Sequence, residues 1–476
     1  MLQTTDFKLQ VSSEIGTLRQ ILVHSPDKGL GKVIPSKAQD WLFEDIVHLE
    51  TIRSKEYDLY TKILLYFLDP EVIRNLVDKN STRDFFKPVN SNFHASKKVI
   101  ELEALLIDIL DNLSVRQQLL AAVCATENCT YQQQQQLLSL SSAELAVLLV
   151  SGTMPDDQIF FAPIPNLIFT RDLGTVINNY VLLNKPARKA RTREALLTKY
   201  IFFNHPIFRN HRQNIIEVPQ SDQHFLIPEG EIDTQNTLEG GDVMMVSKNH
   251  LLIGCGERTT PQAASAVIKI LFAQNVVDKV TVIKIPHKRD FMHLDTVFTQ
   301  VKKNVWVLLS SLFNSDKIDN SAPIDFLTDT KKTDQPEIIQ FEKGRINHPR
   351  KFNKLEELLN EISQTELGST EPTEFIYSGN NVFPHESREQ WTDSCNLLTL
   401  KEGVVLGYDR NNKTLAAFAA KGFTIVKAAD LIQKFESNQL QPENISNTVI
   451  TFPSAELSRA RGGFHCMSMP LFRDEI

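Results

Sequence analysis

Short apolar runs that alternate with segments of helical spacing dominate the pattern of hydrophobic and polar positions along this chain. The strand-like runs are rich in β-branched residues and are bounded by Gly, Asn, Asp or Pro. A helix is predicted over residues 261–272, because Thr260 is a suitable N-cap and Pro261 a suitable first-turn residue. This alternation predicts an α/β fold. The expected strands are residues 20–24, 166–170, 181–183, 243–246, 251–253, 280–283, 305–309 and 403–407.

The stretch from about residue 51 to residue 151 has a different pattern and contains no convincing strand. Residues 99–123 and 142–150 carry apolar side chains at helical spacing. We therefore expect a catalytic domain that is interrupted by a helical segment. The two parts are an α/β catalytic domain of residues 1–60 and 152–476 and an all-helical insertion of residues 61–151.

Composition narrows the classes of protein that the chain can belong to. The 476 residues are 42% hydrophobic and 23% charged, which is an ordinary globular balance. The net charge of −7 argues against nucleic acid or an anionic membrane surface as a partner. Neither a signal peptide nor a membrane span is expected, because the N-terminus lacks a basic segment followed by an apolar stretch and the apolar runs are short. The polar residues 314–335 are typical of a surface loop.

The five cysteines, an odd number in a long chain, argue against a disulfide framework and for a reducing cytoplasm. Cys124 and Cys129 have no second cysteine pair or nearby histidine, so they do not predict a zinc site. Cys466 differs because it follows Arg459, Arg461 and a pair of glycines. Positive neighbours lower the pKa of a thiol and favour the nucleophilic thiolate. An inert buried cysteine is the alternative that this pattern leaves open.

Two clusters place carboxylates beside expected strands. Arg171 and Asp172 follow the apolar run at 166–170, and a turn with a surface ion pair is the simpler interpretation. Glu239 and Asp242 flank two glycines, which let a backbone pass close to another group. A turn with polar ends would give the same pattern.

A third cluster contains His293 and Asp295, which are two positions apart. In an extended chain both side chains point to the same face, where the acid would raise the pKa of the histidine and fix its orientation. A buried histidine with satisfied hydrogen bonds is the alternative. With Cys466, these clusters supply a thiol, a histidine and several carboxylates. Carboxylates bind a planar guanidinium through paired hydrogen bonds, a thiolate can attack its central carbon, and a histidine can handle the proton of the leaving nitrogen.

These motifs together resemble those of the arginine deiminases, in the guanidino-group-modifying superfamily. The resemblance covers nearly the whole chain, in order, and the set of motifs is far more specific than any one of them. It rests on FTRD at 169–172, EGGD at 239–242, MHLDTVF at 292–298 and RGGFHCMSMP at 461–470, with SEIGTLR at 13–19, WLFED at 41–45, GCGERTTPQ at 254–262 and GYDRN at 407–411.

The resemblance implies a pseudo-fivefold α/β propeller of ββαβ units that carries a helical insertion. It also implies the conversion of L-arginine and water to L-citrulline and ammonia in the cytoplasm, by a homo-oligomer that needs no metal or cofactor. By the same resemblance, Cys466 is the nucleophile and forms an amidino-thioether. His293 protonates the departing ammonia and then activates water. Asp172 and Asp295 grip the guanidinium, and Glu239 supports the guanidinium and the proton transfers.

The resemblance also implies residues that hold the amino-acid end of the substrate. Arg191 and Arg258 would bind the α-carboxylate; Arg191 lies in a basic run, so Arg188 is an alternative to it. Arg461 matches an arginine that moves with substrate. The remaining substrate-binding residues are expected to be Asn166 and Phe169.

Phe464, between the glycines and His465, departs from the family pattern, and we expect it to alter gating or substrate choice. We also expect the free enzyme to hold Cys466 as a thiol, because the charge of the substrate can help to ionise it.

Three other functions are compatible with the sequence. The first is a related guanidino or ureido enzyme, such as an amidinotransferase or a citrulline-type hydrolase; agmatine is disfavoured because two arginines are expected to bind a carboxylate. The second is a non-catalytic arginine-binding protein on the same scaffold. The third is a divalent-metal site, with the ligands His293, Asp295, Glu239 and Asp242.

Overall fold

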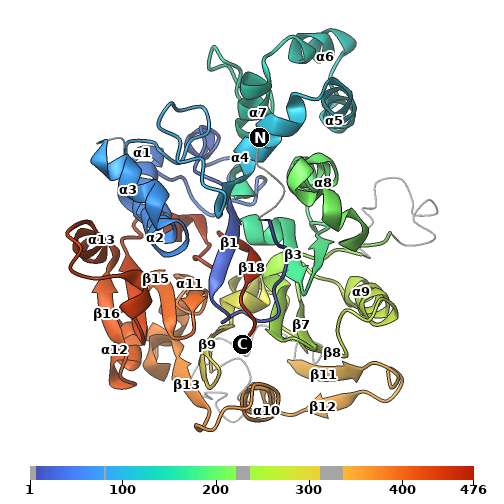
Figure 1. The fold of residues 1–476 in the computed structure, drawn as a ribbon. Coiled ribbons are helices and arrows are strands. Elements are labelled where there is room, and N and C mark those ends of the chain that lie inside the picture. The colour runs from blue at the N-terminus through green and yellow to red at the C-terminus, as the bar shows by residue number, and fades with distance from the viewer. Residues whose placement is uncertain (1–6, 80–81, 221–235, 311–335) are drawn as a thin grey trace.

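The computed structural model describes residues 7–79, 82–220, 236–310 and 336–476 (Figure 1). In these ranges the strands form five sheets, which confirms the expected mixed α/β architecture. Figure 1 shows the sheets in chain order around the middle of the molecule, with helices on the periphery. The loop expected at 314–335 lies outside the described residues, and the next described strand is β11 (Glu337–Glu342).

One pattern recurs in the sheets: two antiparallel strands are followed, after a helical connection, by a strand parallel to the second of them. β3 and β4 are antiparallel and β5 is parallel to β4, and the same relation holds for β6, β7 and β8. Such parallel pairs need a crossover connection, which a helix provides. The strands of these two sheets are β3 (Gly174–Ile177), β4 (Tyr180–Leu183), β5 (Ile215–Glu217), β6 (Val243–Ser247), β7 (His250–Cys255), β8 (Lys279–Lys284), β11 and β12 (Arg350–Phe352).

The other sheets repeat this arrangement. β10 is antiparallel to β9 and parallel to β13, and β15 is antiparallel to β14 and parallel to β17. In the sheet that joins the two ends of the chain, β1 is antiparallel to β18 and parallel to β2. These strands are β1 (Leu18–Val23), β2 (Val99–Glu101), β9 (Phe298–Lys302), β10 (Val305–Leu308), β13 (Glu374–Tyr377), β14 (Leu398–Lys401), β15 (Val404–Tyr408), β16 (Thr424–Lys427), β17 (Thr448–Phe452) and β18 (Met469–Arg473).

One helix begins where the sequence predicts. The expected helix at 261–272 is α9 (Pro261–Ala273), and the hydroxyl of Thr260 accepts a hydrogen bond from the Ala263 amide at its start. No described helix is long and apolar enough to cross a membrane. The remaining α-helices are α1 (Leu49–Thr51), α2 (Asp58–Leu68), α3 (Pro70–Asp78), α4 (Leu102–Leu110), α5 (Leu113–Thr126), α6 (Tyr131–Leu138), α7 (Ser142–Ser151), α8 (Thr192–Asn204), α10 (Leu355–Glu361), α11 (His385–Trp391), α12 (Asn412–Ala420) and α13 (Ala428–Glu436).

The segment that was expected to be all helical contains one strand, β2, so that expectation was wrong for Val99–Glu101. The strand is only three residues long and leads directly into α4, so no alternating pattern could reveal it. The helices around it pack in two places: α2 lies against α13, whereas α4 and α5 lie against α8. The domain boundaries at residues 61 and 151 stay a prediction.

The strand expected at 166–170 is also wrong. This segment forms two short 3₁₀ turns, Pro165–Ile168 and Thr170–Leu173, while the other expected strands are present. An apolar run of this length fits a buried strand and a buried turn equally well, which explains the error. The turns matter for the site, because side chains three positions apart in a 3₁₀ helix project to the same side.

Candidate active site

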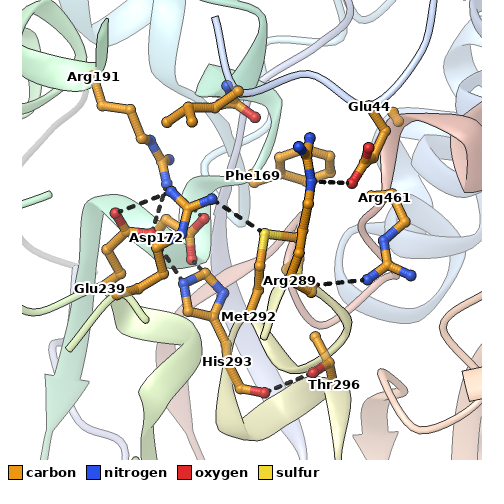
Figure 2. A pocket seen from close by; sticks show the side chains of 15 residues that line it. Glu44, Phe169, Asp172, Arg191, Glu239, Arg289, Met292, His293, Thr296 and Arg461 are labelled. Carbon is orange, nitrogen blue, oxygen red and sulfur yellow. Dashed lines mark hydrogen bonds and ion pairs between the residues drawn. The ribbon is translucent and has the colours of Figure 1, made fainter. Parts of the chain in front are cut away.

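Nine of the ten expected site residues line one pocket (Figure 2). The tenth, Asp295, lies directly beside it, with a carboxylate oxygen 3.5 Å from the sulfur of Cys466. The pocket therefore gathers side chains that are far apart in the sequence, from residues 42–44, 166–296 and 460–466. Its lining is Leu42, Glu44, Asn166, Phe169, Asp172, Arg191, Glu239, Arg258, Arg289, Met292, His293, Thr296, Ala460, Arg461 and Cys466.

The two 3₁₀ turns at 165–173 supply three of these side chains. Asn166, Phe169 and Asp172 are spaced by three, and the Phe169 and Asp172 amides donate to the carbonyls three positions earlier. All three side chains therefore face the pocket, which the strand predicted from sequence would not have allowed. The amide nitrogen of Asn166 donates to the Trp41 carbonyl at 2.7 Å, which leaves its side-chain oxygen toward the pocket lining.

His293 is paired with Glu239, 2.9 Å from ring nitrogen to carboxylate, and lies 3.7 Å from Asp172. Burial alone would lower the pKa of His293, but these carboxylates raise that pKa to about 10. Burial would raise the pKa of Glu239, but Arg191 and His293 hold it well below its ordinary value. The expected pairing of His293 with Asp295 is therefore corrected: a turn at Leu294–Thr296 directs the two side chains to different partners.

The glycine pair after Glu239 is explained by the close approach of two other segments. A Cβ atom on Gly241 would lie 2.6 Å from the imidazole Nδ1 of His293, closer than such contacts permit, and one on Gly240 would meet the carbonyl oxygen of Arg171. The glycines thus let the backbone pass against the imidazole and against the turn that carries Asp172. Asp242 does not enter the pocket: it accepts a hydrogen bond from the Leu294 amide, and burial raises its pKa to about 6. It supports the turn that orients His293.

Arg191 lies deep in the pocket, among carboxylates. Its Nη1 atom donates to Asp172 at 2.9 Å and to Glu239 at 3.2 Å, and its Nε atom donates to Glu194 at 2.8 Å. Arg188, the alternative in the same basic run, is instead exposed and paired with Glu257. The geometry therefore favours Arg191 as the pocket residue.

Cys466 is buried, and its sulfur accepts a hydrogen bond from the Asn396 amide at 3.1 Å. Burial, followed by the charges of Asp295 and Asp172, raises the pKa of this thiol well above its ordinary value. The expected lowering by flanking arginines is therefore wrong: Arg461 is engaged with Trp391, and Arg459 is exposed and paired with Asp45. The expectation of a protonated thiol in the free protein agrees with this direction.

Asn396 also holds the loop that carries the nucleophile. Its side-chain oxygen accepts from the Cys466 amide at 3.0 Å, and a Cβ atom on Gly463 would lie 2.6 Å from that oxygen. The glycine therefore lets the loop approach Asn396. The sequence did not single out this residue, because a lone Asn at the start of an apolar run carries no chemical signal.

A buried network behind Asp295 was missed for a similar reason. The imidazole of His465 bridges Asp295 at 2.8 Å and Glu14 at 3.3 Å, and Arg171 donates both of its terminal nitrogens to Glu14. Burial alone would raise the pKa of Glu14, but Arg171 and His465 hold it well below its ordinary value. The network fixes the orientation of Asp295, since one of its oxygens is always occupied.

Arg461 and Arg258 complete the cationic side of the pocket. The Arg461 guanidinium stacks 3.5 Å from the centre of the Trp391 ring and donates to the carbonyl of the same residue. Arg258 lies 3.9 Å from Glu239 and donates to the sulfur of Met292. Both side chains are buried and line the same pocket as Cys466, so the pocket contains cations as well as carboxylates.

Asp172, Glu239 and His293 lie close enough to hold a metal ion, but the chemistry of the set does not favour one. The guanidinium of Arg191 and the raised pKa of His293 already supply positive charge to both carboxylates. A protonated imidazole cannot be a metal ligand. Asp242 and Asp295, which the metal hypothesis also requires, have other partners.

Comparison with known proteins decides the family. The arginine deiminase family model matches residues 94–473. An arginine deiminase from Staphylococcus haemolyticus is 30% identical over 99% of this chain and 100% of its own, and one from Staphylococcus aureus is 28% identical over the same shares. The chain belongs to the arginine deiminase family.

Solved structures align with this chain at lower similarity. An amidinotransferase of saxitoxin biosynthesis from Microseira wollei aligns over 98% of both chains, with 14% identity and a TM-score of 0.45. A dimethylarginine dimethylaminohydrolase aligns over 64% of this chain and 76% of its own, with 15% identity and a TM-score of 0.34.

One departure of this arginine deiminase family member has a structural explanation. Phe464 was expected to alter the gating of the pocket, but its side chain is 1% exposed and points into the core. It packs against Tyr60, Tyr408 and Phe452, with ring centres 4.6 to 5.1 Å away. Phe464 is not one of the described residues that line the pocket. Its effect is therefore on packing behind the loop of the nucleophile.

Proposed function

We propose that this protein hydrolyses L-arginine to L-citrulline and ammonia through a covalent intermediate on Cys466. One observation carries the proposal: one carboxylate oxygen of Asp172 and one of Asp295 are buried and accept no hydrogen bond from the described residues. Asp172 lines the pocket with Cys466, and the other oxygen of Asp295 lies 3.5 Å from the sulfur. Buried acceptors are normally satisfied, so two free ones at one place indicate a ligand rich in N–H donors. A guanidinium, with its planar set of donors, matches them.

In the first half-reaction the sulfur of Cys466 attacks the central carbon of the bound guanidinium. The thiol gives up its proton, a C–S bond forms and a C–N bond breaks, so that thiol and guanidinium become an amidino-thioether cation and ammonia. Binding of the cation next to Cys466 opposes the effect of Asp295 on the thiol pKa, which makes the thiolate available. His293, protonated and held by Glu239, donates to the leaving nitrogen and recovers a proton from the thiol.

In the second half-reaction water replaces the sulfur. His293 accepts the proton of the attacking water, a C–O bond forms and the C–S bond breaks. The products are the thiol, the ureido group of citrulline and the proton that the ammonia takes up. Glu239 stabilises the imidazolium that forms, because the low pKa of Glu239 keeps this carboxylate negatively charged.

The amino-acid end of the substrate is proposed to meet the cations of the pocket. Arg191 and Arg258 would bind the α-carboxylate, Asn166 the amino-acid end, and Phe169 the aliphatic stem. Arg461, stacked on Trp391, is placed to move toward the substrate. A free carboxylate is therefore part of the recognition, which makes arginine a better fit than its decarboxylated analogue.

We propose the finer architecture on the recurrence of the strand pattern. The five sheets would be the blades of a pseudo-fivefold propeller of ββαβ units, with residues 1–60 and 152–476 as the catalytic domain and 61–151 as the insertion. The acidic net charge and the free cysteines favour a cytoplasmic protein that binds neither nucleic acid nor membranes. Its assembly as a homo-oligomer is proposed from the family resemblance alone.

The test is to incubate the protein with arginine, citrulline or agmatine and to measure citrulline, ornithine and ammonia. We expect citrulline and ammonia in equal amounts from arginine, and none from the Cys466→Ala protein. Ornithine made only when an amine is added would instead indicate an amidinotransferase. No citrulline from arginine would reject the proposal. Activity that survives exhaustive chelation and is lost on thiol alkylation would reject the metal-site alternative.

A further inference from the structure

The guanidinium group of Arg191 occupies the carboxylates that the substrate needs. Its Nη1 atom is shared by Asp172 and Glu239, at 2.9 and 3.2 Å (Figure 2). All three side chains are less than one-tenth exposed, so water does not weaken these contacts. Arg191 holds one oxygen atom of each acid, so a second guanidinium cannot form a paired set of hydrogen bonds with either carboxylate, although the other oxygen of Asp172 accepts no hydrogen bond from the described residues.

The contacts of Arg191 differ in their relation to the pocket. Its Nε atom is bonded to Glu194, a fully buried residue of α8 that does not line the pocket. Its Nη2 atom is buried and makes no hydrogen bond with the described residues. The side chain therefore has one anchor behind the pocket, two contacts inside it, and a donor that is still free to meet an anion.

From this arrangement we infer that Arg191 determines specificity by competing with the substrate, an inference that rests on the proposed function. In the free enzyme its guanidinium takes the place of the substrate guanidinium on Asp172 and Glu239. A substrate with an α-carboxylate offers Arg191 a new anion, so Arg191 leaves the two acids while Glu194 keeps its Nε. A guanidine without a carboxylate offers nothing in exchange and is excluded.

The size of this effect follows from the population of the blocked state. The apparent dissociation constant of a ligand rises as the inverse of the fraction of protein that is competent to bind it. If Arg191 holds the acids about 90 to 99% of the time, a ligand that cannot draw it away binds about 10- to 100-fold more weakly. Because Arg191 is part of the same chain, its effective concentration at the acids is high, and such occupancy is expected.

Competition between Arg191 and the substrate guanidinium makes a prediction that differs from the one for an Arg191 that only binds the substrate carboxylate. Removal of Arg191 takes away one contact to the arginine carboxylate, but it also frees Asp172 and Glu239. Arginine should therefore become a worse substrate, while agmatine, which has the same guanidinium and no carboxylate, should become a better one. Removal of Arg258, which lies 3.9 Å from Glu239, should weaken arginine without a gain for agmatine.

The experiment compares the wild-type enzyme with Arg191→Ala, Arg191→Lys, Arg258→Ala and Arg188→Ala. For arginine and agmatine, kcat/KM is measured by ammonia release, and agmatine binding is measured by calorimetry on the same variants in the Cys466→Ala background, where no turnover occurs. For Arg191→Ala we expect at least about a tenfold gain for agmatine in both measurements and a loss for arginine. Arg188→Ala, an exposed residue of the same basic run, should match the wild type.

Three outcomes would overturn the inference: agmatine unchanged in Arg191→Ala, agmatine weakened together with arginine, or an equal gain for agmatine in Arg258→Ala. If Arg191→Ala does not fold, Arg191→Lys should give a smaller gain of the same sign, because a lysine cannot bridge two acids as a planar fork. A wild-type enzyme that makes no citrulline from arginine would reject the proposed function itself, so the two failures are distinct.

Discussion

The sulfur of Cys466 lies 3.5 Å from a carboxylate oxygen of Asp295, and both groups are buried. A negative charge at this distance opposes ionisation of the thiol, and burial opposes it further. The free protein thus has its nucleophile protonated, and a cationic ligand between the two groups would reverse the balance. This relationship couples the reactivity of the cysteine to the presence of substrate.

Replacement of Asp295 by Asn should separate thiol reactivity from turnover. The loss of the negative charge lowers the pKa of Cys466, so alkylation by iodoacetamide near neutral pH should be faster than in the wild type. Turnover of arginine should fall on the order of 100-fold or more, because the transition state loses a charged contact. Asp290→Asn, which changes an exposed carboxylate near the pocket, should alter neither rate. Slower alkylation of the Asp295→Asn protein would contradict the assignment of the raised thiol pKa to this carboxylate.

Asn396→Asp tests the hydrogen bond to the sulfur. The aspartate keeps an acceptor for the Cys466 amide, but it loses the N–H donor and adds a negative charge, and both changes should raise the pKa of the thiol further. We expect slower alkylation at each pH and a lower kcat, measured with iodoacetamide and by citrulline formation. Ser394→Ala, two positions earlier and bonded to Ser378, is the control. Unchanged alkylation in Asn396→Asp would show that the donor has no influence on the thiolate.

These two residues also show what the sequence can and cannot reveal. Asp295 was found because it lies in a motif with His293, but the partner assigned to it was wrong, since spacing says nothing about a turn between them. Asn396 was not found, because its role comes from a contact with a loop 70 positions away. Glu14 and His465 were missed for the same reason.

A pH dependence of stability is expected from His24, outside the pocket. Burial alone would lower its pKa, but Asp27 and Glu101 each hydrogen bond one ring nitrogen and raise it to about 9. The pKa is raised on folding, so the stabilisation is complete below about pH 6.5 and is lost as the pH rises through 9. The contribution of His24 to the free energy of unfolding should fall on the order of 3 kcal/mol across this window.

Urea denaturation at pH 6 and at pH 9.5 would measure this change. In His24→Gln the imidazolium is absent, so the difference between the two pH values should shrink. His287→Gln replaces an exposed histidine and should leave the difference as in the wild type. A wild-type protein that is equally stable at both pH values would contradict a protonated His24.

Phe464→Leu should reduce stability without changing substrate preference. The smaller side chain leaves space between Tyr60, Tyr408 and Phe452, and core substitutions of this kind cost about 0.5–3 kcal/mol. Thermal unfolding measures the loss, and the ratio of activities on arginine and homoarginine measures preference. A changed ratio with normal stability would return Phe464 to the role in gating that the sequence suggested.

The secondary structure was predictable where the period of the sequence was clear. β4, β6, β7, β8, β10, β15 and α9 follow apolar patterns with defined ends, and they were expected at these places. The segment at 166–170 and the strand β2 failed because short buried elements have no distinctive period. The ion pairs of Arg191 with Asp172 and Glu239 could not be predicted, because they depend on which of several cations the fold places beside these carboxylates.

The contact between His465 and Glu14 joins positions 451 residues apart, and β18 pairs with β1 in the same sheet. During translation the ribosome must deliver both ends of this long stretch before the network behind Asp295 can exist. Growing chains and fragments that end before residue 465 carry most of the pocket lining but lack both this network and Cys466. They therefore cannot consume arginine, which translation itself needs. Activity therefore appears only after the whole stretch from Glu14 to Cys466 has been synthesised.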